Sequence, residues 1–301
     1  MLFINVCRVL AGMAFLAGVP LNCYILFVTG CRMRRTASTV WFLNRAVANL
    51  IFLIFLLLRF IFSLDLTWAT MLCNIITSLH MFSSAFLLTA FSVDRCILVV
   101  RPEWAENHRT PCLAFMIVLV IWALSVGFSL RYGVFWKYDY TPFYMDMDFQ
   151  LDEGRVKAGV PIQFLVGFLI PLALILIPSF YIVLPAKLRR NRLIQSTKPL
   201  KILLGLIPTF SLCWLPYHVF SFVLISPTRP PPLLYPVNAI ISVLTYFSTF
   251  LNPIFYLTME EEYLRYRQRA RNPQTTDNLG PESAEYENRA NCQYLNQGLN
   301  S

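Results

Sequence analysis

Long apolar stretches alternate with short polar segments along most of the chain, and this alternation predicts the fold. A helix that crosses a bilayer needs roughly 20 consecutive, mostly apolar residues. The first stretch is too long for a secretory signal peptide and lacks a charged start and a small-residue cleavage site, so we interpret it as a span. By hydropathy, the predicted spans cover residues 5–29, 39–64, 71–98, 111–133, 158–186, 199–226 and 233–258.

The segments around the spans define the expected domains. We expect an all-α membrane protein whose seven-helix bundle occupies residues 1–258. Residues 259–271 mix charged and apolar positions and predict a short amphipathic helix on the membrane surface. Residues 272–301 turn polar and predict a disordered cytoplasmic tail, with Thr275, Thr276 and Ser283 as candidate phosphorylation sites.

Basic residues gather in alternate segments between the spans, which sets the expected orientation in the membrane. With the N-terminus extracellular and the C-terminus cytoplasmic, the inner loops hold most Lys and Arg, and the outer segments hold acidic residues such as Asp139 and Asp146. The chain is 57% hydrophobic with a net charge of +9, so this charge belongs to the inner face of a multi-pass plasma-membrane protein. It attracts anionic membrane lipid and a cytosolic partner. Nucleic acid is excluded as a partner because there is no soluble basic domain to bind it.

The sequence lacks the signatures of catalysis and of cofactor binding. It has no glycine-rich phosphate loop and no paired catalytic carboxylates, and its three histidines, His80, His108 and His218, are scattered. The eight cysteines show no metal-binding or redox spacing. We therefore expect neither an enzyme nor a bound cofactor or metal.

An acid–base pair, Asp94-Arg95, lies at the inner end of the third span. Ionisable residues are costly in a membrane and are usually functional there. Such a pair can hold a helix bundle closed and then release it. The alternative is an arginine that snorkels to the interface.

The sixth and seventh spans carry motifs that contain proline. Pro216 removes a backbone hydrogen bond and hinges the sixth span, and Trp214 is a bulky group whose rotation would tilt the inner half. The alternative is an ordinary kinked helix with a packed indole. The residues of interest in these two motifs are Phe210, Trp214, Pro216, Asn252, Pro253 and Tyr256.

Taken together and in order, these motifs resemble those of rhodopsin-like (class A) G-protein-coupled receptors over about residues 5–270. The resemblance implies that Asp94, Arg95 and the motifs of spans six and seven form an activation switch. It also implies a polar core in which Asn49 replaces the family's buried, sodium-binding aspartate. An amide is a weaker cation ligand than a carboxylate, so we expect weak sodium sensitivity. The implied polar core consists of Asn22, Asn49, Ser84 and Ser248.

Three segments, residues 30–41, 81–110 and 212–220, resemble the chemoattractant-receptor branch of this family. They look most similar to chemoattractant-type prostaglandin D receptors, with formyl-peptide and chemerin receptors next. The resemblance implies an extracellular ligand that is an anionic lipid, such as a prostanoid, or a peptide. It further implies a heterotrimeric G protein of the inhibitory type, together with arrestin and receptor kinases.

Ligand contacts are expected near the outer ends of the spans. By resemblance, Gln163 stands where a related prostanoid receptor has a lysine, Trp136 stands where it has an arginine, and Tyr217 is retained. Arg59 is a hypothetical replacement anchor for an anionic ligand, and the alternative is an interfacial arginine that snorkels outward. We expect His80 to be a packed polar residue. The ligand-binding candidates are Arg59, Trp136, Lys137, Gln163, Tyr217 and His218.

Departures from the family support a second function, that of a non-signalling decoy or a decayed receptor. The disulfide that the family forms between the third span and the second outer loop has no counterpart, because residues 131–160 contain no cysteine. The family's fifth-span tyrosine is Ser179 here, and Asn49 replaces an aspartate. A transporter is disfavoured because the chain has no inverted repeats and no intramembrane acid pathway.

Overall fold

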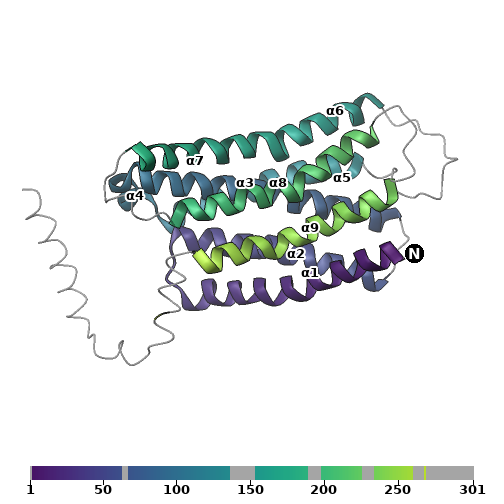
Figure 1. Ribbon diagram of the computed structural model, residues 1–301, viewed down its shortest axis with the longest axis horizontal. Helices are drawn as coiled ribbons and strands as arrows, with labels where there is room; N and C mark the ends of the chain where they lie inside the picture. Colours follow the sequence, from purple (N-terminus) through teal and green to yellow (C-terminus); the bar gives the residue numbers. More distant parts are fainter. Residues whose placement is uncertain are drawn as a thin grey trace, which may run out of the picture.

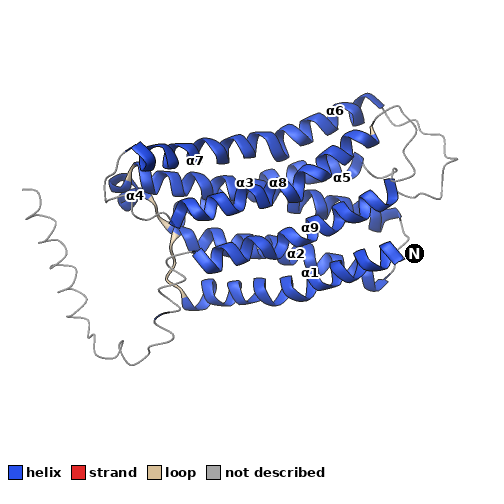
Figure 2. Cartoon of the chain, viewed as in Figure 1, coloured by secondary structure: helices blue, strands red, loops and turns tan. Residues whose placement is uncertain are grey.

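The computed structural model describes residues 2–62, 67–135, 153–188, 198–225, 234–259 and 268. Helices are the only regular structure in these ranges (Figure 2). In chain order they are α1 (Leu2–Phe27), the π-helical segment η1 (Val28–Arg32), α2 (Ala37–Phe62), α3 (Thr67–Val100), α4 (Pro102–His108), α5 (Pro111–Phe135), α6 (Glu153–Phe164), the π-helical segment η3 (Leu165–Leu169), α7 (Ile170–Leu188), α8 (Lys198–Leu224) and α9 (Leu234–Met259).

Each predicted span coincides with a long helix, and α6, η3 and α7 together form the fifth. These helices lie side by side in one bundle, with the N-terminus at the end opposite α4 (Figure 1). Five described helices are long and apolar enough to cross a membrane, and the apolar stretches Ile207–Val223 and Pro236–Leu251 are shorter. The predicted all-α membrane bundle is confirmed.

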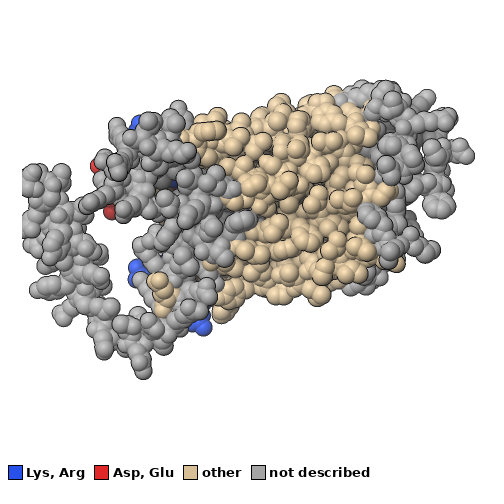
Figure 3. Space-filling model, in the orientation of Figure 1, with Lys and Arg blue, Asp and Glu red and all other residues tan. Residues whose placement is uncertain are grey.

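The surface of the bundle is suited to lipid. Among the described large apolar side chains, Leu16, Phe180 and Leu212 are each about two-thirds exposed or more. In Figure 3 the visible Lys, Arg, Asp and Glu side chains lie at the end of the molecule that carries α4, and the long middle of the visible face is uncharged. A backbone in hydrocarbon must satisfy its polar groups internally, which helices do.

The third span is the central element of the bundle. Helix α3 has 34 residues and packs against α2, α5, α7 and α8. Its buried side chains Met81, Phe82, Leu88 and Phe91 lie in one apolar core with Trp214 of α8. Helix α3 therefore packs against its neighbours at the inner end, in the middle and near the outer end of the bundle.

The π-helical segment η3 widens the fifth span just before Pro171. The Ile170 N–H donates to Leu165 O, and the backbone at Ile170 stays helical. Within η3, Gly167 faces α3, where an added Cβ atom would lie 3.0 Å from Met81 Cε. The absence of a side chain at Gly167 thus allows η3 to approach α3 closely.

Parts of the predicted domain organisation lie outside the described residues. These are the amphipathic helix over 259–271, apart from Met259 and Gln268, and the tail over 272–301. Both stay predictions.

Gly18 marks a close approach of α1 to α2 and α9, and we expect Gly18→Val to destabilise the protein. A Cβ atom there would lie 2.9 Å from Leu53 Cδ1 and 3.2 Å from Thr249 Oγ1. Overpacking of this kind costs about 1–3 kcal/mol of unfolding free energy. The matched control is Gly12→Val in the same helix, where an added Cβ meets nothing within 4 Å. Equal melting temperatures for the two variants in detergent would contradict the expectation.

Candidate functional site

A cluster of charged groups ties α2, α3 and the segment after α4 together at the inner end of the bundle. The guanidinium of Arg109 donates to both carboxylate oxygens of Asp94, at 2.8 and 3.0 Å. It also donates to Ser38 Oγ at 2.6 Å, and Arg95 donates to the same hydroxyl oxygen at 2.7 Å. We call these four residues the inner clamp. A bidentate arginine–carboxylate pair is among the stronger polar contacts in proteins.

The inner clamp corrects one expectation from the sequence. Asp94 and Arg95 were expected to pair with each other, but Arg109 is the partner of the carboxylate. Adjacent residues of a helix do not face each other, so Asp94 and Arg95 point to different neighbours. The guanidinium carbon of Arg95 lies 4.7 Å from the ring centroid of Phe91, in a cation–π contact.

Local structure explains how Ser38 and Arg109 reach the inner clamp. Ser38 lies in the first turn of α2, where Thr36 and Thr39 cap one another: the Thr36 N–H donates to Thr39 Oγ1 at 2.8 Å, and the Thr39 N–H donates to Thr36 Oγ1 at 3.3 Å. Arg109 follows the short helix α4. The backbone N–H of Arg109 donates to Ala105 O at 3.0 Å and so closes the last turn of that helix. Neither residue was predicted from the sequence as part of a site, although Ser38 lies in segment 30–41 and Arg109 in segment 81–110, which resemble the chemoattractant-receptor branch.

A network of amide groups joins four helices in the middle of the bundle. The side chains of Asn22 and Asn49 are 0% exposed, and Asn49 Nδ2 donates to Asn22 Oδ1 at 2.9 Å. Both amides also donate to Thr249 O of α9, at 3.0 and 3.1 Å. Asn49 Oδ1 lies 3.2 Å from His80 Nε2 of α3. We call these four residues the middle network, which supplies the partners that buried amides require.

The membership of the polar core differs from the expectation. Ser248 donates to Thr245 O within its own helix, and Ser84 contributes its backbone carbonyl rather than its hydroxyl. Neither of these bonds involves Asn49. The groups that contact Asn49 instead are the side chain of His80 and the backbone carbonyl of Thr249. His80 is a packed polar residue, as expected.

Arg45 is a further buried residue that was not predicted from the sequence as part of a site. It lies one turn before Asn49 on α2, is only 3% exposed, and donates through Nη1 to Ser84 O at 2.6 Å. Burial of a guanidinium inside the membrane is expensive and marks a functional position. An arginine within a predicted span was the signal that could have identified it.

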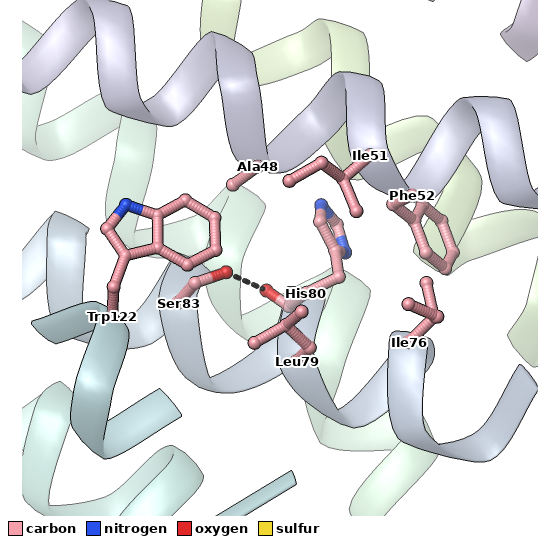
Figure 4. A pocket seen from close by; sticks show the side chains of 8 residues that line it. All are labelled: Ala48, Ile51, Phe52, Ile76, Leu79, His80, Ser83 and Trp122. Atoms are coloured by element: carbon pink, nitrogen blue, oxygen red, sulfur yellow. Dashed lines mark hydrogen bonds between the residues drawn. The ribbon is translucent and has the colours of Figure 1, made fainter. Parts of the chain in front are cut away.

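Figure 4 shows His80 of α3 beside α2, at a narrow crevice that is lined by Ala48, Ile51, Phe52, Ile76, Leu79, His80, Ser83 and Trp122. The imidazole stacks on Phe52, with ring centroids 4.3 Å apart, and its centroid lies 5.5 Å from that of Trp214. The Ser83 hydroxyl donates to His80 O at 3.3 Å. The middle network is thereby in direct contact with the tryptophan of α8.

The motif residues of α8 and α9 surround this contact. Trp214 and Phe210 are buried, and Phe210 stacks on Phe168 with centroids 5.5 Å apart. Pro216 lies inside α8 and removes the hydrogen bond that the Leu212 carbonyl would accept. Pro253 lies inside α9. Asn252 and Tyr256 belong to α9, and their side chains lie outside the described residues.

Three of the ligand-binding candidates meet near the outer end of the bundle. Gln163 Nε2 of α6 lies 3.5 Å from the Tyr217 hydroxyl of α8 and 4.0 Å from Met81 Sδ of α3. His218 follows Tyr217 and contacts Phe164, with centroids 5.4 Å apart. We call Gln163, Tyr217, His218 and Met81 the outer cluster. Arg59 lies in α2, but its side chain, like the whole of Trp136 and Lys137, lies outside the described residues.

Comparison with known proteins gives one family. The pattern of the 7 transmembrane receptor (rhodopsin family) matches residues 21–256. The chain is 33% identical to Chemerin-like receptor 1 of Bos taurus over 282 residues, which cover 84% of this chain and 76% of the relative. It is 34% identical to Prostaglandin D2 receptor 2 of Mus musculus over 278 residues, covering 84% and 72%. It is 30% identical to N-formyl peptide receptor 3 of Pongo pygmaeus over 279 residues, covering 84% and 79%.

The middle network generates a prediction about stability. We expect Asn49→Ala to lower the unfolding free energy by about 1–3 kcal/mol, because it leaves the buried Asn22 Oδ1 and His80 Nε2 without their partner. Melting of the purified protein in detergent measures this loss. Asn238→Ala, at an exposed position of α9, is the matched control. If the two variants have the same melting temperature, the network does not stabilise the bundle.

Proposed function

The chain belongs to the rhodopsin family of seven-transmembrane receptors, and from this premise we propose that it is a chemoattractant receptor that activates a heterotrimeric G protein of the inhibitory type. Receptors of this family reside in the plasma membrane and pass a signal from an extracellular ligand to a G protein. The similarity to chemerin-like, formyl-peptide and prostaglandin D2 receptors supports the chemoattractant branch.

The observation that carries the proposal is the inner clamp. It holds Arg95 against Ser38 of α2 through a hydrogen bond, and it holds the neighbouring Asp94 against Arg109. These contacts fasten the inner end of α3 while the bundle is closed. A conformation that breaks the Ser38 bonds frees Arg95 for a cytosolic partner.

The proposed route of activation follows residues that are in contact. A ligand at the outer cluster touches Tyr217, whose ring centroid lies 6.1 Å from that of Trp214. Motion of Trp214 tilts the inner half of α8 about Pro216. A ligand with higher affinity for the open state shifts the population toward it.

The orientation and the remaining partners follow from the same proposal. The charged side chains visible in Figure 3 lie at the end of the bundle that carries α4, and we assign this end to the cytoplasm by the positive-inside rule. The N-terminus then faces the cell exterior. Arrestin and receptor kinases would act on the cytoplasmic tail. Arg59 and Lys137 are proposed to hold an anionic part of the ligand.

A specific observation favours the alternative, a non-signalling decoy. Ser179 replaces the tyrosine that supports the active state in the family, and its hydroxyl donates at 2.7 Å to Ile175 O of its own helix. The Ser179 hydroxyl is thus bonded within α7, and Arg95 lacks the hydrogen bond that the family's tyrosine would give it in the active state. Guanine-nucleotide exchange on the G protein, measured at verified surface expression, separates the two functions.

We expect Arg95→Ala to abolish ligand-induced and basal nucleotide exchange, because this arginine is the group freed for the G protein. The control is Arg101→Ala, which removes an exposed arginine near the same inner end. Surface expression is measured in parallel for both variants. Undiminished exchange in Arg95→Ala would reject the switch role.

We expect Ser38→Ala to raise basal exchange about fivefold or more. The change removes the acceptor of two charged hydrogen bonds, each worth about 1.5–3 kcal/mol, and 1 kcal/mol shifts a population ratio about fivefold. The matched control is Ser242→Ala, whose hydroxyl donates to Asn238 O of its own helix. Basal exchange equal to that of the control would show that the clamp does not restrain activation.

A further inference from the structure

Arg45 and Asn49 lie one helical turn apart on the face of α2 that packs against α3. Arg45 is 3% exposed and donates through Nη1 to Ser84 O at 2.6 Å, and Asn49 Oδ1 lies 3.2 Å from His80 Nε2. His80 and Ser84 are likewise one turn apart on α3. Residues at this spacing share a helix face, so the two contacts belong to successive turns of one interface.

The guanidinium of Arg45 brings a positive charge next to the middle network. Side chains one turn apart on a helix have Cβ atoms about 5–6 Å from each other. Arg45 is also close enough to His80 to interact with it electrostatically. An arginine side chain is not deprotonated in proteins, so this charge is permanent. The middle network therefore has a fixed cation beside it.

The resemblance to the receptor family implies a sodium ion beside Asn49, but the groups around Asn49 do not fit one. Asn49 offers a neutral amide in place of a carboxylate, and hard cations favour carboxylate oxygens. Its Nδ2 donates to Asn22 Oδ1 at 2.9 Å and to Thr249 O at 3.1 Å. These two oxygens already accept hydrogen bonds, and the amide N–H groups that face them repel a cation.

The charges around the middle network do not favour a bound cation either. Of the acidic residues that the structure describes, Asp94 is the buried one, and it pairs with Arg109 in the inner clamp. A sodium ion beside Asn49 would meet the charge of Arg45 without a carboxylate of the middle network to offset it. Like charges at this separation weaken binding by about tenfold or more in a protein interior.

We propose that Arg45 is the built-in cation of the middle of the bundle, and that its tethered guanidinium takes the place of a bound sodium ion and keeps that ion out. The bond from Arg45 to Ser84 O joins α2 to α3 without an ion from solution. The stability of the closed bundle is then independent of sodium. The inference goes beyond the proposed function, because it holds whether or not the chain activates a G protein.

The test distinguishes the charge of Arg45 from the simpler explanation that the amide of Asn49 alone weakens sodium binding. Melting temperatures of the purified full chain are measured in sodium chloride and in choline chloride at equal ionic strength, in mildly alkaline buffer. A higher melting temperature in sodium reports binding of the ion to the folded state. We expect no such rise for the unchanged chain.

Asn49→Asp restores a carboxylate, and we still expect no sodium-specific rise, because Arg45 pairs with the new carboxylate. Asn49→Asp/Arg45→Leu leaves that carboxylate without the guanidinium. We expect this double variant to bind sodium about tenfold or more tightly than Asn49→Asp. Asn49→Asp/Arg45→Lys is the matched control, which keeps the positive charge and should show no rise.

Four results would overturn the inference. These are a sodium-specific rise in the unchanged chain, a rise in Asn49→Asp or in the lysine control as large as that in the leucine variant, and a folded leucine variant that shows no rise. If the leucine variant does not fold, the unchanged chain and Asn49→Asp still decide, because a rise in either one contradicts exclusion by Arg45. Nucleotide exchange measured in parallel tests the receptor function separately.

Discussion

The bundle lies in a medium that offers its polar side chains no water, so each buried polar group needs a partner inside the protein. In the middle network a few groups supply partners for the two buried amides. One carbonyl, that of Thr249, accepts from two amides, and the side chain of Asn49 connects α1, α3 and α9 to α2. The positions of four helices relative to one another therefore depend on the amide of Asn49.

The same constraint explains why charged groups occur where they do. At the inner end, a bidentate pair neutralises Asp94, and a single hydroxyl, that of Ser38, accepts from two guanidinium groups. Two cations that share one neutral acceptor repel each other, so the contact of Arg95 with α2 is weaker than a contact with a carboxylate. A receptor whose inner end must open on activation needs a contact between α2 and α3 that is weak enough to break. Arg45, by contrast, lies deeper and is bonded to a backbone carbonyl, which fixes α2 against α3.

The two ends of the bundle differ in chemistry. The inner clamp is ionic, whereas the outer cluster is neutral and leaves two polar atoms unsatisfied among the described residues. Helix α3 contributes to both, through Asp94 and Arg95 at one end and Met81 near the other. His80, between them on the same helix, contacts both Asn49 and Trp214. A change at the outer cluster therefore reaches the middle network through direct packing.

The sequence by itself determined the seven spans, the all-α class and the family, because long apolar runs and proline or Asp-Arg motifs are local properties of the chain. It also identified Asn22, Asn49, Trp214, Gln163 and Tyr217 as positions that matter. Only the tertiary structure decided which side chains meet: Asp94 with Arg109, Asn49 with His80, Arg45 with Ser84, and Gln163 with Tyr217. These pairs are 15 to 54 residues apart in the chain. Their contacts depend on the rotation of each helix about its own axis, which is set by packing against neighbours and not by the periodicity of a single span.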